Sequence, residues 1–173
     1  MRFAQIRKMD ISNGSGIGVS LFTQGCNLHC HNCHNPEQWD YNGGIEYTSE
    51  TKNKILELLD KPYITRLSIL GGEPISKQNI PELMVLLAAV PQNKKIWLYT
   101  GHTLENLIKM NNAGVDYILT NIDYLVDGPF QEQNKDITLA FRGSSNQHIW
   151  YNSKKGNALF FKDVTKDFDE GKY

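Results

Sequence analysis

All three cysteines of this chain lie within one short stretch, GCNLHCHNCHNPEQWD, at residues 25–40. Three residues separate Cys26 from Cys30, and two separate Cys30 from Cys33. An odd number of thiols argues against a disulfide framework. Polar neighbours argue against core packing, where cysteine is otherwise common; these are Asn27, His29, His31, Asn32, His34 and Asn35. The stretch therefore predicts a metal centre.

Two kinds of metal centre fit these ligands. A Cys₃His zinc site would combine the thiolates with His29, His31 or His34 and give a binding module without catalysis. Zinc sites usually divide their ligands between two separated pairs, whereas here His102 and His148 stand alone. A [4Fe–4S] cluster is normally held by four thiolates, so three would leave one iron open to a small molecule. The residues alone leave both alternatives open.

A second motif, LGGEP at residues 70–74, follows a predicted strand. The adjacent glycines Gly71 and Gly72 let the backbone approach a ligand closely, and Pro74 holds Glu73 extended. Glu73 and nearby carbonyl groups could accept hydrogen bonds from an ammonium group. Alone, the motif is better explained as an ordinary strand-to-helix turn. Its combination with the cysteine loop is far more specific.

The elements that would position these motifs alternate along the chain. Apolar patterns predict strands at residues 2–10, 17–25, 66–70, 94–101 and 123–128. Amphipathic patterns predict helices at 48–60, 79–90 and 103–112, with Pro81 in the first turn of the second helix and with Asn and Gly114 closing the third. This alternation is typical of a parallel sheet with crossover helices.

The alternation of predicted strands and helices ends at about residue 131. Beyond it, ITLAFRGSSNQHIWY and NALFF indicate short strands, and KDVTKDFDEGKY indicates a polar tail. We expect a single α/β domain over residues 1–173, with a core at about 15–130 and a C-terminal extension at about 131–173. A closed (β/α)₈ barrel typically needs about 250 residues. The chain is therefore expected to form an open, partial β/α barrel.

The composition indicates an ordinary globular protein. Basic residues number 18 and acidic residues 19, so the net charge of −1 favours neither nucleic acid nor an anionic membrane as a partner. No apolar run is long enough to span a bilayer. The N-terminal residues lack the apolar stretch of a signal peptide. We expect a cytoplasmic protein, in a compartment that keeps thiols reduced.

The two motifs together resemble those of the radical S-adenosylmethionine superfamily. Cys26, Cys30 and Cys33 match its cluster motif, and Gly71-Gly72-Glu73-Pro74 matches its methionine-binding motif. Within the superfamily, FTQGCNLHCHNCHNPEQWD, LYTGHT, YLVDGPF and LAFRGSSNQ resemble the anaerobic ribonucleoside-triphosphate reductase-activating proteins, over residues 22 to about 147. One position departs from the common pattern, because Asn32 stands where many members carry an aromatic residue.

The resemblance implies a partial barrel of the radical S-adenosylmethionine type and two cofactors. A [4Fe–4S] cluster would be bound by Cys26, Cys30 and Cys33, and S-adenosylmethionine would bind its open iron. Gly71 to Pro74 would orient the methionine amine, and the backbone at Asn32, Cys33 and His34 would contact the adenosine part. Thr100 and Asp127, at the ends of predicted strands where α/β sites collect, are assigned to the same ligand, with local turn bonding as the alternative.

The resemblance also implies the reaction and the partners. The reduced cluster would cleave S-adenosylmethionine, and the 5′-deoxyadenosyl radical would remove a hydrogen atom from a glycine Cα of an anaerobic (class III) ribonucleoside-triphosphate reductase. A low-potential donor such as flavodoxin would supply the electron. Arg142 would close the barrel or contact the partner. Alternatives are another glycyl-radical protein or a small molecule as substrate, or the zinc module.

Overall fold

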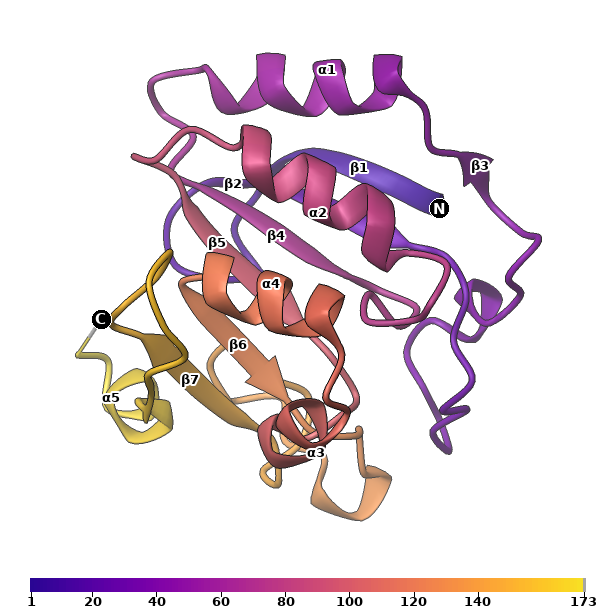
Figure 1. Ribbon diagram of the computed structural model, residues 1–173. Helices are drawn as coiled ribbons and strands as arrows, with labels where there is room; N and C mark the ends of the chain where they lie inside the picture. Colours follow the sequence, from indigo (N-terminus) through magenta and orange to yellow (C-terminus); the bar gives the residue numbers. More distant parts are fainter. Residues whose placement is uncertain (173) are drawn as a thin grey trace.

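The computed structural model describes residues 1–172 and shows a mixed α/β fold built on one sheet (Figure 1). The strands are β1 (Arg2–Asp10), β2 (Gly18–Thr23), β3 (Ile45–Glu46), β4 (Arg66–Gly71), β5 (Lys95–Tyr99), β6 (Tyr124–Asp127), β7 (His148–Asn152) and β8 (Phe161–Asp163). The helices are η1 (Pro36–Gln38), α1 (Ser49–Leu59), α2 (Ile80–Ala89), α3 (Leu104–Lys109), α4 (Ala113–Asn121), η2 (Glu132–Asn134) and α5 (Thr165–Asp169).

Within the described residues the sheet has eight strands in the order β3-β1-β2-β4-β5-β6-β7-β8, and it does not close. The central strands β2, β4, β5 and β6 pair in parallel, whereas the pairings that involve β1, β3, β7 and β8 are antiparallel. Strands on both sides of the parallel centre thus belong to the same sheet. The expectation of an open α/β sheet with crossover helices is confirmed.

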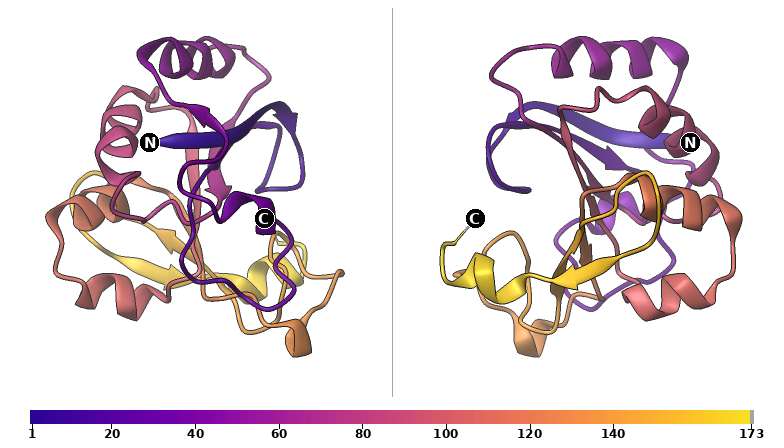
Figure 2. Two further views of the ribbon diagram at one scale, coloured as in Figure 1. Left: turned by 90° about the vertical axis from the view of Figure 1, so that its right-hand side faces the viewer. Right: turned by 60° about the vertical axis from the view of Figure 1, so that its left-hand side comes forward.

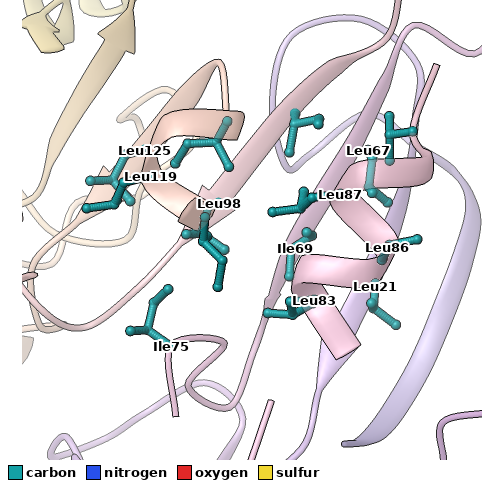
Figure 3. Close-up of a cluster of buried hydrophobic side chains, with 14 of the residues drawn as sticks. Leu21, Leu67, Ile69, Ile75, Leu83, Leu86, Leu87, Leu98, Leu119 and Leu125 are labelled. Atoms are coloured by element: carbon teal, nitrogen blue, oxygen red, sulfur yellow. The ribbon is translucent and has the colours of Figure 1, made fainter. Parts of the chain in front are cut away.

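Helices α1, α2 and α4 cover one face of the sheet (Figures 1 and 2). Leu83, Leu86 and Leu87 of α2 pack on Ile69 of β4, and Leu119 of α4 packs beside the neighbouring strands (Figure 3). Successive residues of a strand point to opposite faces of the sheet, so every second strand residue faces the helices. The strand and helix side chains that meet there are buried.

The other face of the sheet is polar and aromatic. Arg66 is fully buried there, and its Nη2 donates to the carbonyl oxygen of Asp10 at 2.7 Å. Trp97 is also buried and packs with Tyr124, Phe141 and Phe168. The loop between β1 and β2 covers Trp97 so closely that a Cβ at Gly14 would lie 2.8 Å from its ring.

Two sequence-based expectations were wrong. Gly114 does not close a helix: α3 ends before Asn111, whose φ is +47°, and Gly114 lies in the first turn of α4. In the segment 137–151, where short strands were expected, β7 forms at the end, but residues 137–141 form turns. The polar tail contains α5 with buried Phe168. No helix among residues 1–172 combines the length and apolarity needed to cross a bilayer.

Candidate functional site

A cavity of about 500 Å³ opens at the carboxyl ends of the four parallel strands. One wall comes from the cysteine loop after β2, another from residues 71–73 and 99–101 after β4 and β5, and a third from the segment 128–143 after β6. The cysteine loop and this last segment both lie on the lower side of the sheet in Figure 1. Such a volume is within the range of about 300–1,000 Å³ common for small-molecule sites.

All three cysteines line this cavity. Cys26 follows β2 directly and is buried, whereas Cys30 and Cys33 are half-buried. The backbone turns tightly between the last two, with the Cys33 N–H donating to the Cys30 carbonyl at 3.1 Å. His29 and Asn32 adopt positive φ values of 46° and 54°, so the loop follows no regular helix. The stretch thus presents its thiols from an irregular loop, as the sequence predicted.

Hydrogen bonds to the returning chain hold the base of the cysteine loop. The N–H groups of Gly25 and Cys26 donate to the carbonyl oxygens of Gln38 and Trp39 at 2.9 and 3.1 Å. The side-chain amide of Gln24 donates to two further carbonyl groups, those of Glu37 and Asp40. The loop is therefore anchored at its first cysteine.

The environment opposes ionisation of two of the thiols. Burial raises the pKa of the Cys26 and Cys30 thiols, and nearby acidic groups act in the same direction. For Cys26 these groups are Glu73 and Cys30, and for Cys30 they are Cys33 and Glu73. A bound cation would offset this cost, because thiolates rather than thiols ligate metals.

The GGEP motif packs directly against the cysteine loop. The Gly72 N–H donates to the Thr23 carbonyl at 2.9 Å, and the Glu73 N–H donates to the Gly25 carbonyl at 2.8 Å. A Cβ at Gly72 would lie 2.6 Å from the Gly25 oxygen, and Gly71 has a φ of +114°. Both positions therefore require glycine for this contact.

Glu73 is buried, and three donors from the protein meet its carboxylate. Oε1 accepts from the Ile75 N–H and the Thr100 hydroxyl, and Oε2 accepts from the Gly101 N–H, each at 2.9 Å. Burial raises the pKa of this carboxyl, while the hydrogen bonds act in the opposite direction. The carboxylate thus ties the end of β4 to the end of β5.

Comparison with known proteins identifies the family. Residues 12–150 match the family model of the 4Fe-4S single cluster domain. Proteins named anaerobic ribonucleoside-triphosphate reductase-activating protein are 38% identical in Salmonella typhi and 36% in Escherichia coli K12, over 154 residues, covering 86% of this chain and 97% of each relative. The same-named protein of phage T4 is 33% identical over 156 residues, covering 88% of this chain and 96% of that protein. The chain belongs to this family of activating proteins.

In this activating protein the sequence-predicted residues divide into two groups. The cavity brings together the three cysteines with His34, Gly71, Gly72, Glu73 and Thr100. Asn32, Pro74 and Asp127 lie outside its lining. Asn32 is exposed, and Pro74 is buried behind the motif.

Thr100 and Asp127 both form hydrogen bonds to other groups of the protein. The Thr100 hydroxyl donates to Glu73 and accepts from the His102 N–H at 3.1 Å. The Asp127 carboxylate accepts from the Leu104 N–H at 2.6 Å, at the start of α3, and from the His148 N–H at 3.3 Å. Only the bond between Thr100 and His102 is a local turn bond. The bonds of Thr100 to Glu73 and of Asp127 to Leu104 and His148 join segments 27, 23 and 21 positions apart.

Sequence reasoning missed part of the cavity wall. Ile137, Leu139 and Phe141 line it from a segment that was expected to be a strand. Tyr99 also lines it, and its buried hydroxyl has no hydrogen-bond partner within residues 1–172. The alternation of apolar residues at 137–141 was the available signal. Across the described chain, no three His, Cys, Asp or Glu side chains converge on one point to hold a single metal ion.

Proposed function

We propose that this activating protein binds a [4Fe–4S] cluster through Cys26, Cys30 and Cys33 and cleaves S-adenosylmethionine to form a glycyl radical on an anaerobic ribonucleoside-triphosphate reductase. The observation that carries the proposal is one cavity shared by all three thiols and the GGEP motif. The thiolates of a cluster bind different iron atoms, so they need not meet at one point. The residues present therefore fit the group.

When bound, the two cofactors would supply one-electron chemistry, the reductive cleavage of the S–C5′ bond that leads to removal of a hydrogen atom from a glycine Cα. The protein's own groups bind and orient. The backbone at Gly71 and Gly72, which lines the cavity beside the thiols, receives the methionine amine. Glu73 fixes this backbone through its bonds to β5.

Several finer assignments belong to the same proposal. The open parallel sheet with its site at the strand ends supports a partial barrel of the radical S-adenosylmethionine type. The ring of His34 lies 4.9 Å from that of Phe130 at the cavity wall. This position supports the proposed contact of Asn32, Cys33 and His34 with the adenosine part of S-adenosylmethionine. Pro74 holds the backbone of Glu73 extended, and the Thr100 hydroxyl orients the Glu73 carboxylate by its hydrogen bond. The proposed electron donor is a low-potential protein such as flavodoxin, in the cytoplasm.

The test is an anaerobic reconstitution with iron and sulfide, followed by dithionite, S-adenosylmethionine and a purified class III reductase. We expect a brown protein with about four irons per chain and a glycyl-radical signal on the reductase by electron paramagnetic resonance. One zinc per chain, no colour and no radical would instead support the zinc module. A glycyl radical on another protein, with none on the class III reductase, would identify that other protein as the substrate.

A further inference from the structure

The third wall of the cavity is an irregular segment that is nevertheless well fixed at its base. Lys135 and Ser144 form an isolated β-bridge, and the Ser145 N–H donates to the Asn134 carbonyl at 2.8 Å. The Gln147 side chain accepts from the Gly143 N–H and donates to the Gly128 carbonyl, both at 2.9 Å. Residues 135–144, here called the wall loop, therefore form a loop whose two ends are held together.

The C-terminal end of the wall loop is held by the C-terminal helix. Nη1 and Nη2 of Arg142 donate to Oδ1 and Oδ2 of Asp169, both at 2.8 Å. The Arg142 side chain is only 3% exposed and that of Asp169 is 38% exposed. Paired bonds of this kind fix direction as well as distance. In both views of Figure 2, α5 lies beside the segment that carries the wall loop.

Phe141 gives independent evidence that this end is constrained. Its φ is +56°, a left-handed conformation that a bulky side chain rarely adopts unless its surroundings enforce it. Its ring lies 5.4 Å from that of Trp97 and 5.7 Å from that of Phe168 in α5. Helix α5 is itself fixed to β7, because the Thr165 hydroxyl accepts from the Ile149 N–H at 2.8 Å.

The chemistry of the wall loop differs from that of the cofactor side. Ile137, Leu139 and Phe141 line the cavity, and Ile137 is 90% exposed at its edge. The charge of Arg142 is already neutralised by Asp169. The wall loop also lines the cavity with Lys135 and Asp136, so it mixes apolar with charged side chains. Such a wall can contact both the side chains and the backbone of a peptide segment.

We propose that the Arg142–Asp169 pair is a positioning device by which α5 sets the wall loop to receive the glycine-bearing segment of the reductase. The inference rests on the proposed function, since it assigns one wall of that site to the protein substrate. Arg142 and Asp169 act through the wall loop and do not take part in the radical chemistry. The C-terminal helix thus contributes to substrate recognition.

The test compares Asp169→Asn with Glu170→Gln. Both remove one carboxylate charge from adjacent positions, and both carboxylate side chains are 38% exposed. Glu170 pairs only with Lys166 and Lys172 among the described residues, so it is a matched control. Asp169→Glu keeps the charge and serves as the conservative variant.

The primary readout is the affinity of the reconstituted protein for the purified reductase, measured by fluorescence anisotropy. We expect Asp169→Asn to weaken binding about tenfold, Glu170→Gln to leave it unchanged, and Asp169→Glu to recover most of it. Formation of 5′-deoxyadenosine without reductase should remain within about twofold of wild type in all three variants, since the cofactor walls are untouched.

Hydrogen exchange gives a second readout that does not depend on radical chemistry. The amides of Asp136 and Ser145 should exchange faster in Asp169→Asn only, while those of β4 and β5 should not change. Equal binding by Asp169→Asn and Glu170→Gln would overturn the inference, as would equal losses of binding and of uncoupled cleavage. A wild type that binds the reductase but makes no 5′-deoxyadenosine would instead refute the proposed function and leave the binding comparison intact.

Discussion

At the scale of single residues, Glu73 stands out because its buried carboxylate lies near the Cys26 and Cys30 thiols and has no ion pair among residues 1–172. Its partners are two backbone N–H groups and one hydroxyl. The sequence predicted that Glu73 and Thr100 belong to the site, because both follow strands. It could not show that Thr100 gives its only hydroxyl proton to Glu73, since that contact joins residues 27 positions apart.

Replacing Thr100 by valine tests this arrangement. The change preserves shape but removes one of the three donors to Glu73. Because one hydrogen bond contributes about 1 kcal/mol, we expect the KM for S-adenosylmethionine to rise roughly five- to tenfold with little change in kcat. The measurement is 5′-deoxyadenosine formation against S-adenosylmethionine concentration. Thr120→Val, which removes a hydroxyl bonded within α4, is the control, and equal KM values in both variants would contradict the account.

The three cysteines give a second residue-scale prediction. Replacing Cys26, Cys30 or Cys33 by alanine should reduce iron retention and lower 5′-deoxyadenosine formation about 100-fold or more. The fold should survive, because the loop is held through the backbone of Gly25 and Cys26. Iron analysis, product quantification and circular dichroism check this. Any single variant with full cleavage activity would be incompatible with a three-thiolate cluster.

At the scale of elements, the regular strands and helices were predictable, and the exceptions have local causes. The third predicted helix is followed at once by a further helix, α4. Asn111 ends α3 with a positive φ, and the side chain of Asn112 caps α4. Two adjacent asparagines thus separate two helices, where the sequence indicated the end of one. Gly114 follows the cap and is not a terminator.

In the segment 137–151, expected to contain short strands, β7 forms but residues 137–141 do not form a strand, for a topological reason. Its alternating apolar residues have the period of a strand, but both edges of β6 are already paired, with β5 and with β7. Its apolar residues Ile137, Leu139 and Phe141 line the cavity instead. Periodicity alone does not distinguish a sheet face from a cavity wall.

The turn between β1 and β2 yields a prediction on pH. Burial alone would raise the pKa of Asp10, but hydrogen bonds from the Asn13 side chain and from the N–H groups of Ser12 and Asn13 lower it below its ordinary value of 3.8. A carboxyl with a lowered pKa stabilises the fold above its unfolded pKa of about 3.9, and this contribution is lost as pH falls through the folded value. The free energy of unfolding should therefore decrease below about pH 4.

Asp10→Asn isolates this contribution from other carboxyl groups. The variant should be less stable at neutral pH, because Arg66 loses an anionic neighbour 3.6 Å away. Its stability should also depend less on pH between about 3 and 5. Urea unfolding of the cluster-free protein across this range checks both statements. Identical pH slopes for the two proteins would show that Asp10 does not contribute.

At the scale of the whole molecule, the site is assembled by an open sheet whose four parallel strands end at one edge. The sequence predicted this edge, because each motif follows a strand. It did not predict that α5 returns to the cavity wall, since a polar tail carries no signal for a partner such as Arg142. The cysteines and the GGEP motif were recognisable locally, whereas the wall loop depends on contacts that only the fold creates.

The most direct test of the central claim follows one hydrogen atom. A class III reductase labelled with deuterium at its glycine Cα positions would be mixed with the reconstituted protein, dithionite and S-adenosylmethionine, and the 5′-deoxyadenosine would be analysed by mass spectrometry. The account predicts product that carries one deuterium from the labelled reductase, together with a glycyl radical on that protein. Unlabelled product alongside a glycyl radical, or no product from a protein with its cluster intact, would contradict it.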